Sequence, residues 1–232
     1  MKNIYFIMTV FQLFLSVSLC AQVTGTFTDS RDGHQYRTIK IGTQTWMAEN
    51  LAYLPYVNEP SINRSTERCY YINGNRQTEL NVAKNSENYK IYGVLYNWFS
   101  AMDGAQSSSD TPSKVQGVCP HGWHIPSEGE WEELEKTIST IEKGLKKKIV
   151  KNMSYWLKNN PDNIEGFNAL LGGGKFDVNN YTPVGGVALF WTSTEEEEKA
   201  GFAKTFNVTN YSKGISNITK TCGYSVRCIR DE

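Results

Sequence analysis

Residues 126–131 read Pro-Ser-Glu-Gly-Glu-Trp and contain the clearest structural signal in the chain. The Ser127 hydroxyl can accept a hydrogen bond from the Glu130 amide while the Glu130 carboxylate accepts one from the Ser127 amide, an arrangement called a capping box. Apolar residues then recur at three- and four-residue steps, at Trp131, Leu134, Ile138 and Ile141. The sequence therefore predicts an amphipathic helix that begins at this point.

Helical spacing of apolar residues predicts further helices on both sides of the first. Residues 145–158 form a second amphipathic segment, with one face made of Leu145, Ile149, Met153 and Trp156. We interpret the lysine run at 146–148 as the solvated face of this helix. Upstream, residues 92–102 carry aromatic and apolar side chains at helical steps and predict a short buried helix.

Extended segments lie towards both ends of the chain. Residues 36–41 alternate in character before Gly42, which predicts a strand followed by a hairpin or tight bend. Further strands are predicted over 188–194, 202–208 and 224–229. Strands at both ends with helices between them predict an α+β domain whose terminal strands pair.

Segments rich in turn-forming residues separate these elements. Residues 55–90 predict a long surface excursion, and residues 104–114 predict a loop. The run Gly172-Gly173-Gly174-Lys175 is followed by Phe176, so it lacks the Gly-Lys-Ser/Thr ending of a phosphate-binding loop. We expect this run to allow close backbone packing instead.

The N-terminus is typical of a secretory signal peptide. An early lysine is followed by a short, mainly apolar stretch over residues 4–19 and then by small residues. Lipoprotein anchoring through Cys20 is disfavoured because the bulky Leu19 precedes it, so we expect a signal peptide at 1–21 and one mature domain at 22–232. The protein is thus expected to be exported to the cell surface or beyond, with no integral membrane span in the mature chain.

Composition bears on the class of partner. The chain has 24 basic and 24 acidic residues, so its formal net charge gives no reason to expect nucleic acid as a partner. Hydrophobic residues make up 39% of the chain and aromatic residues 12%, which is enough apolar material for a packed core. The mature chain is therefore expected to be globular.

Candidate chemical sites are few. Cys119, His121 and His124 are all residue types that ligate zinc, but one short cluster without a distant second pair of ligands is a weak metal signal. The acidic residues of segment 128–135 are explained by the first turns and the polar face of the predicted helix. No Gly-x-Ser-x-Gly nucleophile motif appears. No catalytic, cofactor-binding or metal-binding residue is therefore predicted.

Cysteine content fits an exported protein. Cleavage after residue 21 leaves four cysteines: Cys69, Cys119, Cys222 and Cys228. An even number in such a protein usually forms disulfides, and four cysteines allow three pairings. The sequence alone leaves the choice among these pairings open.

A series of ordered sequence blocks runs from about residue 28 to residue 231. The blocks are 32–33, 36–42, 46–51, 69–70, 92–93, 95–98, 119–127, 130–131, 166–170, 190–194 and 225–228. Together they resemble the Fibrobacter succinogenes major paralogous domain family. That family is similar to the C-type lectin-like superfamily, and residues 123–131 are similar to the motif that begins a helix in formylglycine-generating enzymes. The resemblance implies a C-type lectin-like fold with two helices and paired terminal β-strands.

The resemblance does not imply the activities of these distant relatives. Formylglycine-generating enzymes carry a catalytic cysteine pair before their last strand, where this chain has only Cys222. The calcium-dependent sugar site of C-type lectins needs a Glu-Pro-Asn-like triplet and a later Trp-Asn-Asp. Here Glu59-Pro60-Ser61 precedes the helices, and Trp191 is followed by Thr192-Ser193. Neither site is expected in this chain.

The resemblance does imply a disulfide pairing. Family members have a cysteine just before the Tyr-Gly block that pairs with the one at Cys69, but this chain has Asn88-Tyr89-Lys90 there. By resemblance we expect Cys119 to pair with Cys228, which ties the start of the helix to the last strand. Cys69 and Cys222 are then expected to form the second pair.

These observations predict an exported, non-catalytic binding module. We expect it to recognise a glycan or a surface protein through the segments 55–90, 104–116 and 172–186. One alternative is an enzyme of the formylglycine-generating type. Another is a structural subunit of a surface assembly, which exposed edge strands would favour.

Overall fold

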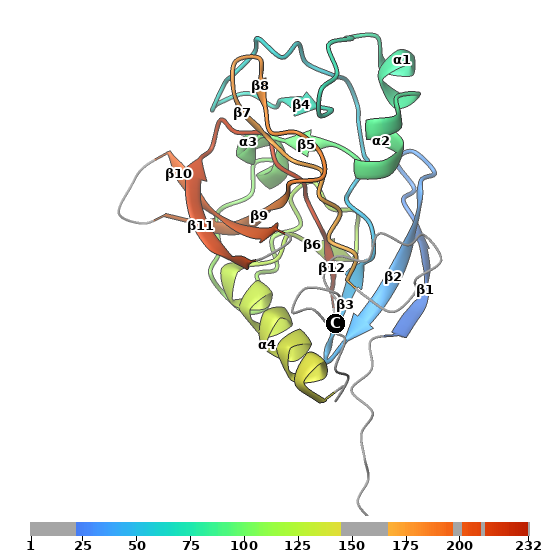
Figure 1. The fold of residues 1–232 in the computed structure, drawn as a ribbon, viewed down its shortest axis with the longest axis vertical. Helices are drawn as coiled ribbons and strands as arrows, with labels where there is room; N and C mark the ends of the chain where they lie inside the picture. The colour runs from blue at the N-terminus through green and yellow to red at the C-terminus, as the bar shows by residue number, and fades with distance from the viewer. Residues whose placement is uncertain (1–21, 145–166, 197–200, 210–211, 232) are drawn as a thin grey trace, which may run out of the picture.

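The computed structural model describes residues 22–144, 167–196, 201–209 and 212–231, which form a mixed α+β fold (Figure 1). The described strands form one five-stranded sheet, one three-stranded sheet and two two-stranded sheets. The predicted α+β class is confirmed at this level. The signal peptide predicted over 1–21 and the second helix predicted over 145–158 lie outside the described residues. None of the described helices is long and apolar enough to cross a membrane.

The five-stranded sheet combines segments that are far apart in the sequence. Its order is β1 (Gln22–Thr28), β2 (Gln35–Ile41), β3 (Gln44–Met47), β12 (Ile229–Arg230) and β6 (Trp123–His124), and all neighbours are antiparallel. The hairpin predicted at Gly42 is confirmed, because β2 and β3 pair directly and Gly42 has a φ of 62° in their connection. Strand β12 joins the N-terminal strands as predicted, but it does so through β3 rather than through β1.

The three-stranded sheet is also antiparallel. Its order is β11 (Lys213–Thr219), β10 (Phe202–Thr209) and β9 (Val187–Glu195), and the last two are the strands that the sequence predicts. Strand β11 was not predicted, because it consists mainly of polar residues with only two isoleucines and lacks an apolar alternation. The strand predicted over 224–229 is shorter in the structure, where only β12 and isolated bridges at Tyr224 and Ser225 pair with neighbours.

Helix α4 (Glu128–Gly144) is the helix that the capping box predicts. Its apolar face fully buries Trp131, Leu134 and Ile138, each of which contributes roughly 1.5–3 kcal/mol through burial. The Trp131 ring stacks on Phe206 of β10 with centroids 4.5 Å apart and meets Trp46 of β3 at 4.8 Å. The helix therefore packs between the two larger sheets, as Figure 1 shows for its contact with β9 to β11.

The single buried helix predicted over 92–102 is wrong. The structure has helix α2 (Glu87–Tyr92), strand β5 (Leu95–Tyr96) and helix α3 (Trp98–Met102). Helix α2 ends at Gly93, which has a φ of 71° and lies so close to the Leu51 carbonyl that a Cβ would come within 2.7 Å of its oxygen. Helix α3 is capped at its start by Asn97, whose side chain accepts a hydrogen bond from the Ser100 amide at 2.9 Å.

The predicted surface excursion over 55–90 is wrong in part. It contains helix α1 (Leu80–Lys84) and strand β4 (Tyr70–Tyr71), which pairs with β5. Tyr71 and Ile72 are fully buried, so this part of the segment packs into the interior instead of remaining on the surface. A second small hairpin, β7 (Lys175–Asp177) with β8 (Asn180–Tyr181), lies beside it at the top of Figure 1.

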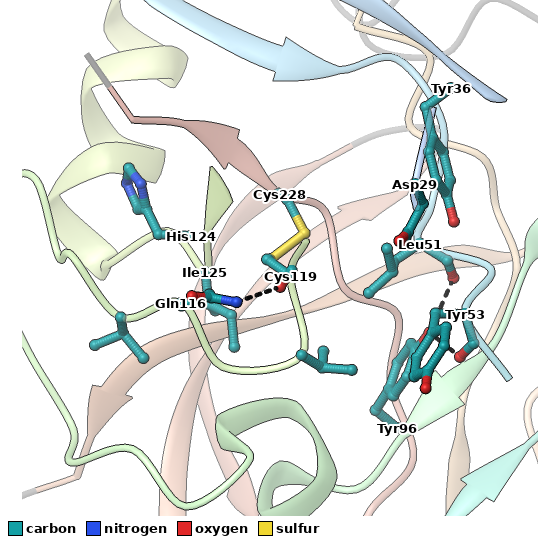
Figure 2. Close-up of a disulfide and its surroundings, with 12 residues drawn as sticks. Asp29, Tyr36, Leu51, Tyr53, Tyr96, Gln116, Cys119, His124, Ile125 and Cys228 are labelled. Carbon is teal, nitrogen blue, oxygen red and sulfur yellow. Dashed lines mark hydrogen bonds between the residues drawn. A yellow bond between two sulfur atoms is a disulfide. The ribbon is translucent and has the colours of Figure 1, made fainter. Parts of the chain in front are cut away.

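A disulfide joins Cys119 to Cys228, which confirms that predicted pairing (Figure 2). Their Cα atoms are 6.0 Å apart although the two residues are separated by 109 positions in the sequence. The bond links the loop before β6 to the segment that leads into β12. It therefore fixes the same junction that the five-stranded sheet forms by backbone pairing.

The second expected pair, Cys69 with Cys222, does not form. Both residues are buried free thiols. Cys69 packs in a small cluster with Tyr71 and Leu95, whereas Cys222 belongs to the main core. The Cys222 thiol instead donates a hydrogen bond to the Phe176 carbonyl oxygen at 3.3 Å. The two thiols thus belong to different packing clusters, although both lie near Lys175.

Candidate functional site

A cavity of about 480 Å³ opens beside the first turns of α4. The chain segments that form it are the β2–β3 turn, the loop at 111–114, strand β6, helix α4 and strand β12 with the residue that follows. We call it the α4 cavity; its polar lining residues are Thr43, Gln44, Thr111, Lys114, His124, Glu130, Glu133, Arg230 and Asp231. Its volume lies within the range of small-molecule sites, roughly 300–1,000 Å³.

His124 connects α4 with the segment after β12. Its Nδ1 lies 2.5 Å from Asp231 Oδ1, and its Nε2 lies 2.8 Å from Glu130 Oε1. Burial opposes protonation of the ring, but the hydrogen bonds and charges of Glu130 and Asp231 outweigh it and raise the pKa of His124. Each ring nitrogen therefore faces a carboxylate, an arrangement that favours the protonated form of the ring.

Glu130 organises the same region from the helix side. Its Oε2 accepts hydrogen bonds from the Ser127 amide at 2.9 Å and the Ser113 amide at 3.1 Å, while Ser127 Oγ accepts one from the Glu130 amide at 3.3 Å. The predicted capping box is confirmed. Because the same carboxylate also binds His124, one side chain fixes the helix start, the 111–114 loop and strand β6 together.

The β2–β3 turn is fastened to α4 by its polar side chains. The Thr43 hydroxyl donates to Glu133 Oε1 at 2.7 Å. The Gln44 amide donates to the Glu130 carbonyl oxygen at 3.0 Å, and its Oε1 accepts a hydrogen bond from Trp46 Nε1 at 3.1 Å. This wall of the cavity is therefore rigid before any ligand binds.

Two cations line the α4 cavity without an acidic partner among the residues that the structure describes. These are Lys114 and Arg230. Lys114 has a φ of 56°, which is unfavourable for a side chain with a Cβ, and such backbone outliers gather at functional sites. The Arg230 guanidinium lies 5.4 Å from the centroid of the Trp123 ring, a cation–π contact that orients it.

A second, shallower recess has a volume of about 430 Å³. It lies between residues 59–61, residues 76–78 and Asn179, so it joins two of the three segments predicted to carry recognition. Asn179 has a φ of 54°, again a non-glycine residue in the left-handed region. The third predicted segment, 104–116, contributes to the α4 cavity through its part around 111–114.

A known protein family matches most of the chain. The model of the Fibrobacter succinogenes major domain matches residues 39–230. The chain belongs to this family. The matched range of this Fibrobacter succinogenes major domain contains the disulfide, α4 and nearly all of the cavity lining. No curated protein and no solved structure matches the chain.

The cluster of Cys119, His121 and His124 in this Fibrobacter succinogenes major domain does not assemble as a metal site. Cys119 is bonded to Cys228, His121 is exposed, and His124 is held between two carboxylates. Within the described ranges, no group of three or more histidine, cysteine, aspartate or glutamate residues could hold a metal ion.

The glycine run before Lys175 packs closely against its neighbours, as predicted. A Cβ on Gly173 would come within 2.4 Å of the Thr182 carbonyl oxygen. Lys175 itself is fully buried, its Nζ lies 4.6 Å from the centroid of the Tyr71 ring, and it has no hydrogen-bond partner among the described residues. Burial lowers its pKa, although the nearby Cys222, Asp177 and Cys69 act in the opposite direction.

Sequence reasoning missed most of the cavity residues of this Fibrobacter succinogenes major domain. Lys114, Arg230 and Asp231 stand in no recognisable motif, and Asp231 is 107 positions away from the histidine that it binds. The family blocks give a partial signal, because they include His124 and Glu130 and reach to within a few residues of Asp231. The cavity residues are seen to lie together only when β12 is placed between β3 and β6.

Proposed function

We propose that this protein is an exported binding module of C-type lectin-like fold and that the α4 cavity holds a glycan. The observation that carries the proposal is the convergence of hydroxyl, amide, carboxylate and cationic groups from separate segments around one concave site. Sugar hydroxyls both donate and accept hydrogen bonds, so they need donors and acceptors placed side by side. Concave sites with a few fixed polar groups are typical of small-ligand recognition.

Export and the lectin-like fold draw support from features outside the cavity. The signal-peptide pattern of residues 1–21 and the Cys119–Cys228 disulfide both fit an oxidising compartment. The pairing of β12 with β3 beside the long helix α4 agrees with the lectin-like arrangement that the family resemblance implies.

Binding is favoured over catalysis by the state of the candidate reactive groups. Both nitrogens of His124 are engaged by carboxylates, so the ring has no free lone pair to act as a base. Cys69 and Cys222 are buried, and neither lines the α4 cavity or the shallower recess. The thiol pair that a formylglycine-generating enzyme needs thus has no counterpart in either site.

The test is a glycan and polysaccharide array probed with residues 22–232, disulfide intact, with and without calcium. We expect saturable binding to one glycan class. Glu133→Ala should weaken that binding about tenfold because it removes a cavity acceptor. The matched control is Glu132→Ala, which changes the exposed neighbouring glutamate outside the lining and should bind as the wild type does.

Two outcomes would contradict the proposal. A folded wild-type protein that binds nothing on the array would direct attention to a protein partner or a surface assembly. Strand β11 at the edge of the three-stranded sheet would then be the first surface to examine by sizing and cross-linking. Binding that Glu133→Ala leaves unchanged would place the glycan elsewhere on the molecule.

A further inference from the structure

We infer that the ligand of the α4 cavity is an acidic glycan, whose uronate carboxylate is held by Lys114 and Arg230. This inference rests on the proposed function and narrows its ligand to one chemical class. It follows from which polar side chains of the cavity have partners inside the protein and which cationic side chains have no acidic partner among the described residues.

The acidic residues of the cavity are all engaged by protein donors. Glu130 accepts hydrogen bonds from two backbone amides and from His124. Asp231 is bound by His124, and Glu133 accepts a hydrogen bond from the Thr43 hydroxyl. Both ring nitrogens of His124 are in turn engaged by Glu130 and Asp231. The other donors, two backbone amides and one hydroxyl, are neutral. The three carboxylates are therefore satisfied as hydrogen-bond acceptors, while His124 can offset at most one of their charges.

The two remaining cations differ in this respect. No ion pair joins Lys114 or Arg230 to an acidic residue in the described part of the chain, although both line the same cavity. A pair of unpaired cations in a concave site favours an anionic group on the ligand. A carboxylate suits them best, since its two oxygens match the fork of an arginine and can also accept from an ammonium group.

The backbone on both sides of Lys114 is anchored, which directs this residue outward. Ser113 Oγ donates to the Ile125 carbonyl oxygen at 2.5 Å, and the Ile125 amide donates to the Val115 carbonyl oxygen at 2.8 Å. Ser113 and Val115 are buried, whereas Lys114 between them is exposed and lines the cavity. The unfavourable φ of Lys114 is thus maintained by its neighbours, and its exposed side chain lines the cavity.

Arg230 is oriented by a different contact. Its backbone pairs with Trp123 across β12 and β6, and its guanidinium lies over the Trp123 ring. A cation–π contact of this kind restrains the guanidinium, whose N–H groups can still donate hydrogen bonds to a carboxylate. Engaged carboxylates nearby, on Glu133 and Asp231, retain lone pairs that can accept from the hydroxyls of the same sugar. A uronate residue offers both kinds of group at once.

The experiment compares matched ligands that differ only in charge. Affinities of residues 22–232 are measured by calorimetry for short oligogalacturonates and oligomannuronates and for their methyl esters, which keep every hydroxyl but lose the negative charge. We expect one acid series to bind at least about tenfold more tightly than its esters, with an affinity that falls as salt is added.

Variants then assign the charge to its residues. Lys114→Gln and Arg230→Lys should each weaken uronate binding about tenfold and leave ester binding nearly unchanged. The control Lys136→Gln removes an exposed charge from α4 outside the cavity and should bind as the wild type does. Because Lys114 is exposed, its variant should keep the wild-type unfolding midpoint, so a lost affinity cannot be ascribed to unfolding.

The outcomes distinguish the inference of an acidic ligand from the proposal that the α4 cavity binds a glycan. Equal affinity for acids and esters, or wild-type uronate binding by Lys114→Gln and Arg230→Lys together, would overturn the acidic ligand while glycan binding itself stands. Failure of every charged and neutral glycan to bind would overturn the proposed function, and the inference with it.

Discussion

Lys175 occupies a position that is unfavourable for an ammonium group. It is fully buried, its Nζ has no hydrogen-bond partner among the described residues, and the Tyr71 ring lies 4.6 Å away. Removal of a cation from water costs several kcal/mol unless hydrogen bonds replace the hydration shell. The buried Lys175 side chain should therefore lower the free energy of unfolding of the domain.

Lys175→Met tests this cost. Methionine has a similar length without the charge, so we expect the free energy of unfolding at pH 7 to increase by about 1–3 kcal/mol. Chemical denaturation measures the change, with Lys136→Met on the exposed face of α4 as the control. The explanation fails if Lys175→Met destabilises the protein, because the amine would then have a partner that stabilises it.

The same substitution has a pH signature. The pKa of Lys175 is lowered from 10.5, so between its native pKa and 10.5 the unfolded chain binds a proton that the native protein does not. Wild-type stability must gain relative to Lys175→Met as pH rises through that window. The advantage of the variant should accordingly shrink on approach to pH 10.5.

At the scale of elements, the start of α4 combines local and distant interactions. The capping box between Ser127 and Glu130 is local, but the Glu130 carboxylate also binds Ser113 and His124 from other segments. The start of the helix therefore has two roles: it caps α4, and it connects α4 to the segments that contain Ser113 and His124. Its two roles can be separated by substitution, because Ser127 takes part only in the first.

Ser127→Ala removes the hydroxyl that accepts from the Glu130 amide. We expect a loss of about 1 kcal/mol in the free energy of unfolding, with the α4 cavity otherwise retained. Ser139→Ala, at an interior position of the same helix, should change stability by only a few tenths of a kcal/mol. Urea denaturation measures the free energy of unfolding of both variants. Equal decreases for Ser127→Ala and Ser139→Ala would show that the Ser127 cap does not stabilise the helix specifically.

How far the sequence predicts these elements depends on how local their causes are. The helix start and the β2–β3 hairpin at Gly42 were predictable, because neighbouring residues determine them. The helix break at Gly93 was not, since it depends on the Leu51 carbonyl on another part of the fold. For the same reason the bond between His124 and Asp231 could not be anticipated, as nothing near either residue signals the other.

At the scale of the whole molecule, two of the four cysteines in the described ranges form a disulfide and the other two are free thiols. The Cys119–Cys228 bond closes a loop of 109 positions, for which the chain-entropy model gives a stabilisation of roughly 4–5 kcal/mol. We expect the double variant Cys119→Ser, Cys228→Ser to lose most of that amount. The variant Cys69→Ala, which breaks no bond, should lose only its packing contribution.

Thiol titration checks the same assignment on unmodified protein. Cys69 and Cys222 are buried, so native protein lacking residues 1–21 should react slowly with a thiol reagent and expose two thiols in denaturant. Peptide mapping should recover Cys119 bonded to Cys228. Recovery of a Cys69–Cys222 peptide, or of free Cys119, would refute the arrangement.

The insertion of β12 between β3 and β6 has a consequence for how the chain reaches its native state. During synthesis, the hairpin of β2 and β3 emerges early, yet its free edge has no partner until the ribosome has passed residue 230. Folding of such a topology is slow, because the chain must lose the entropy of closing a long loop before β12 can form its contacts with β3 and β6. A nascent polypeptide that stays open for so long remains able to pass through a narrow translocation channel, which is what the proposed export requires.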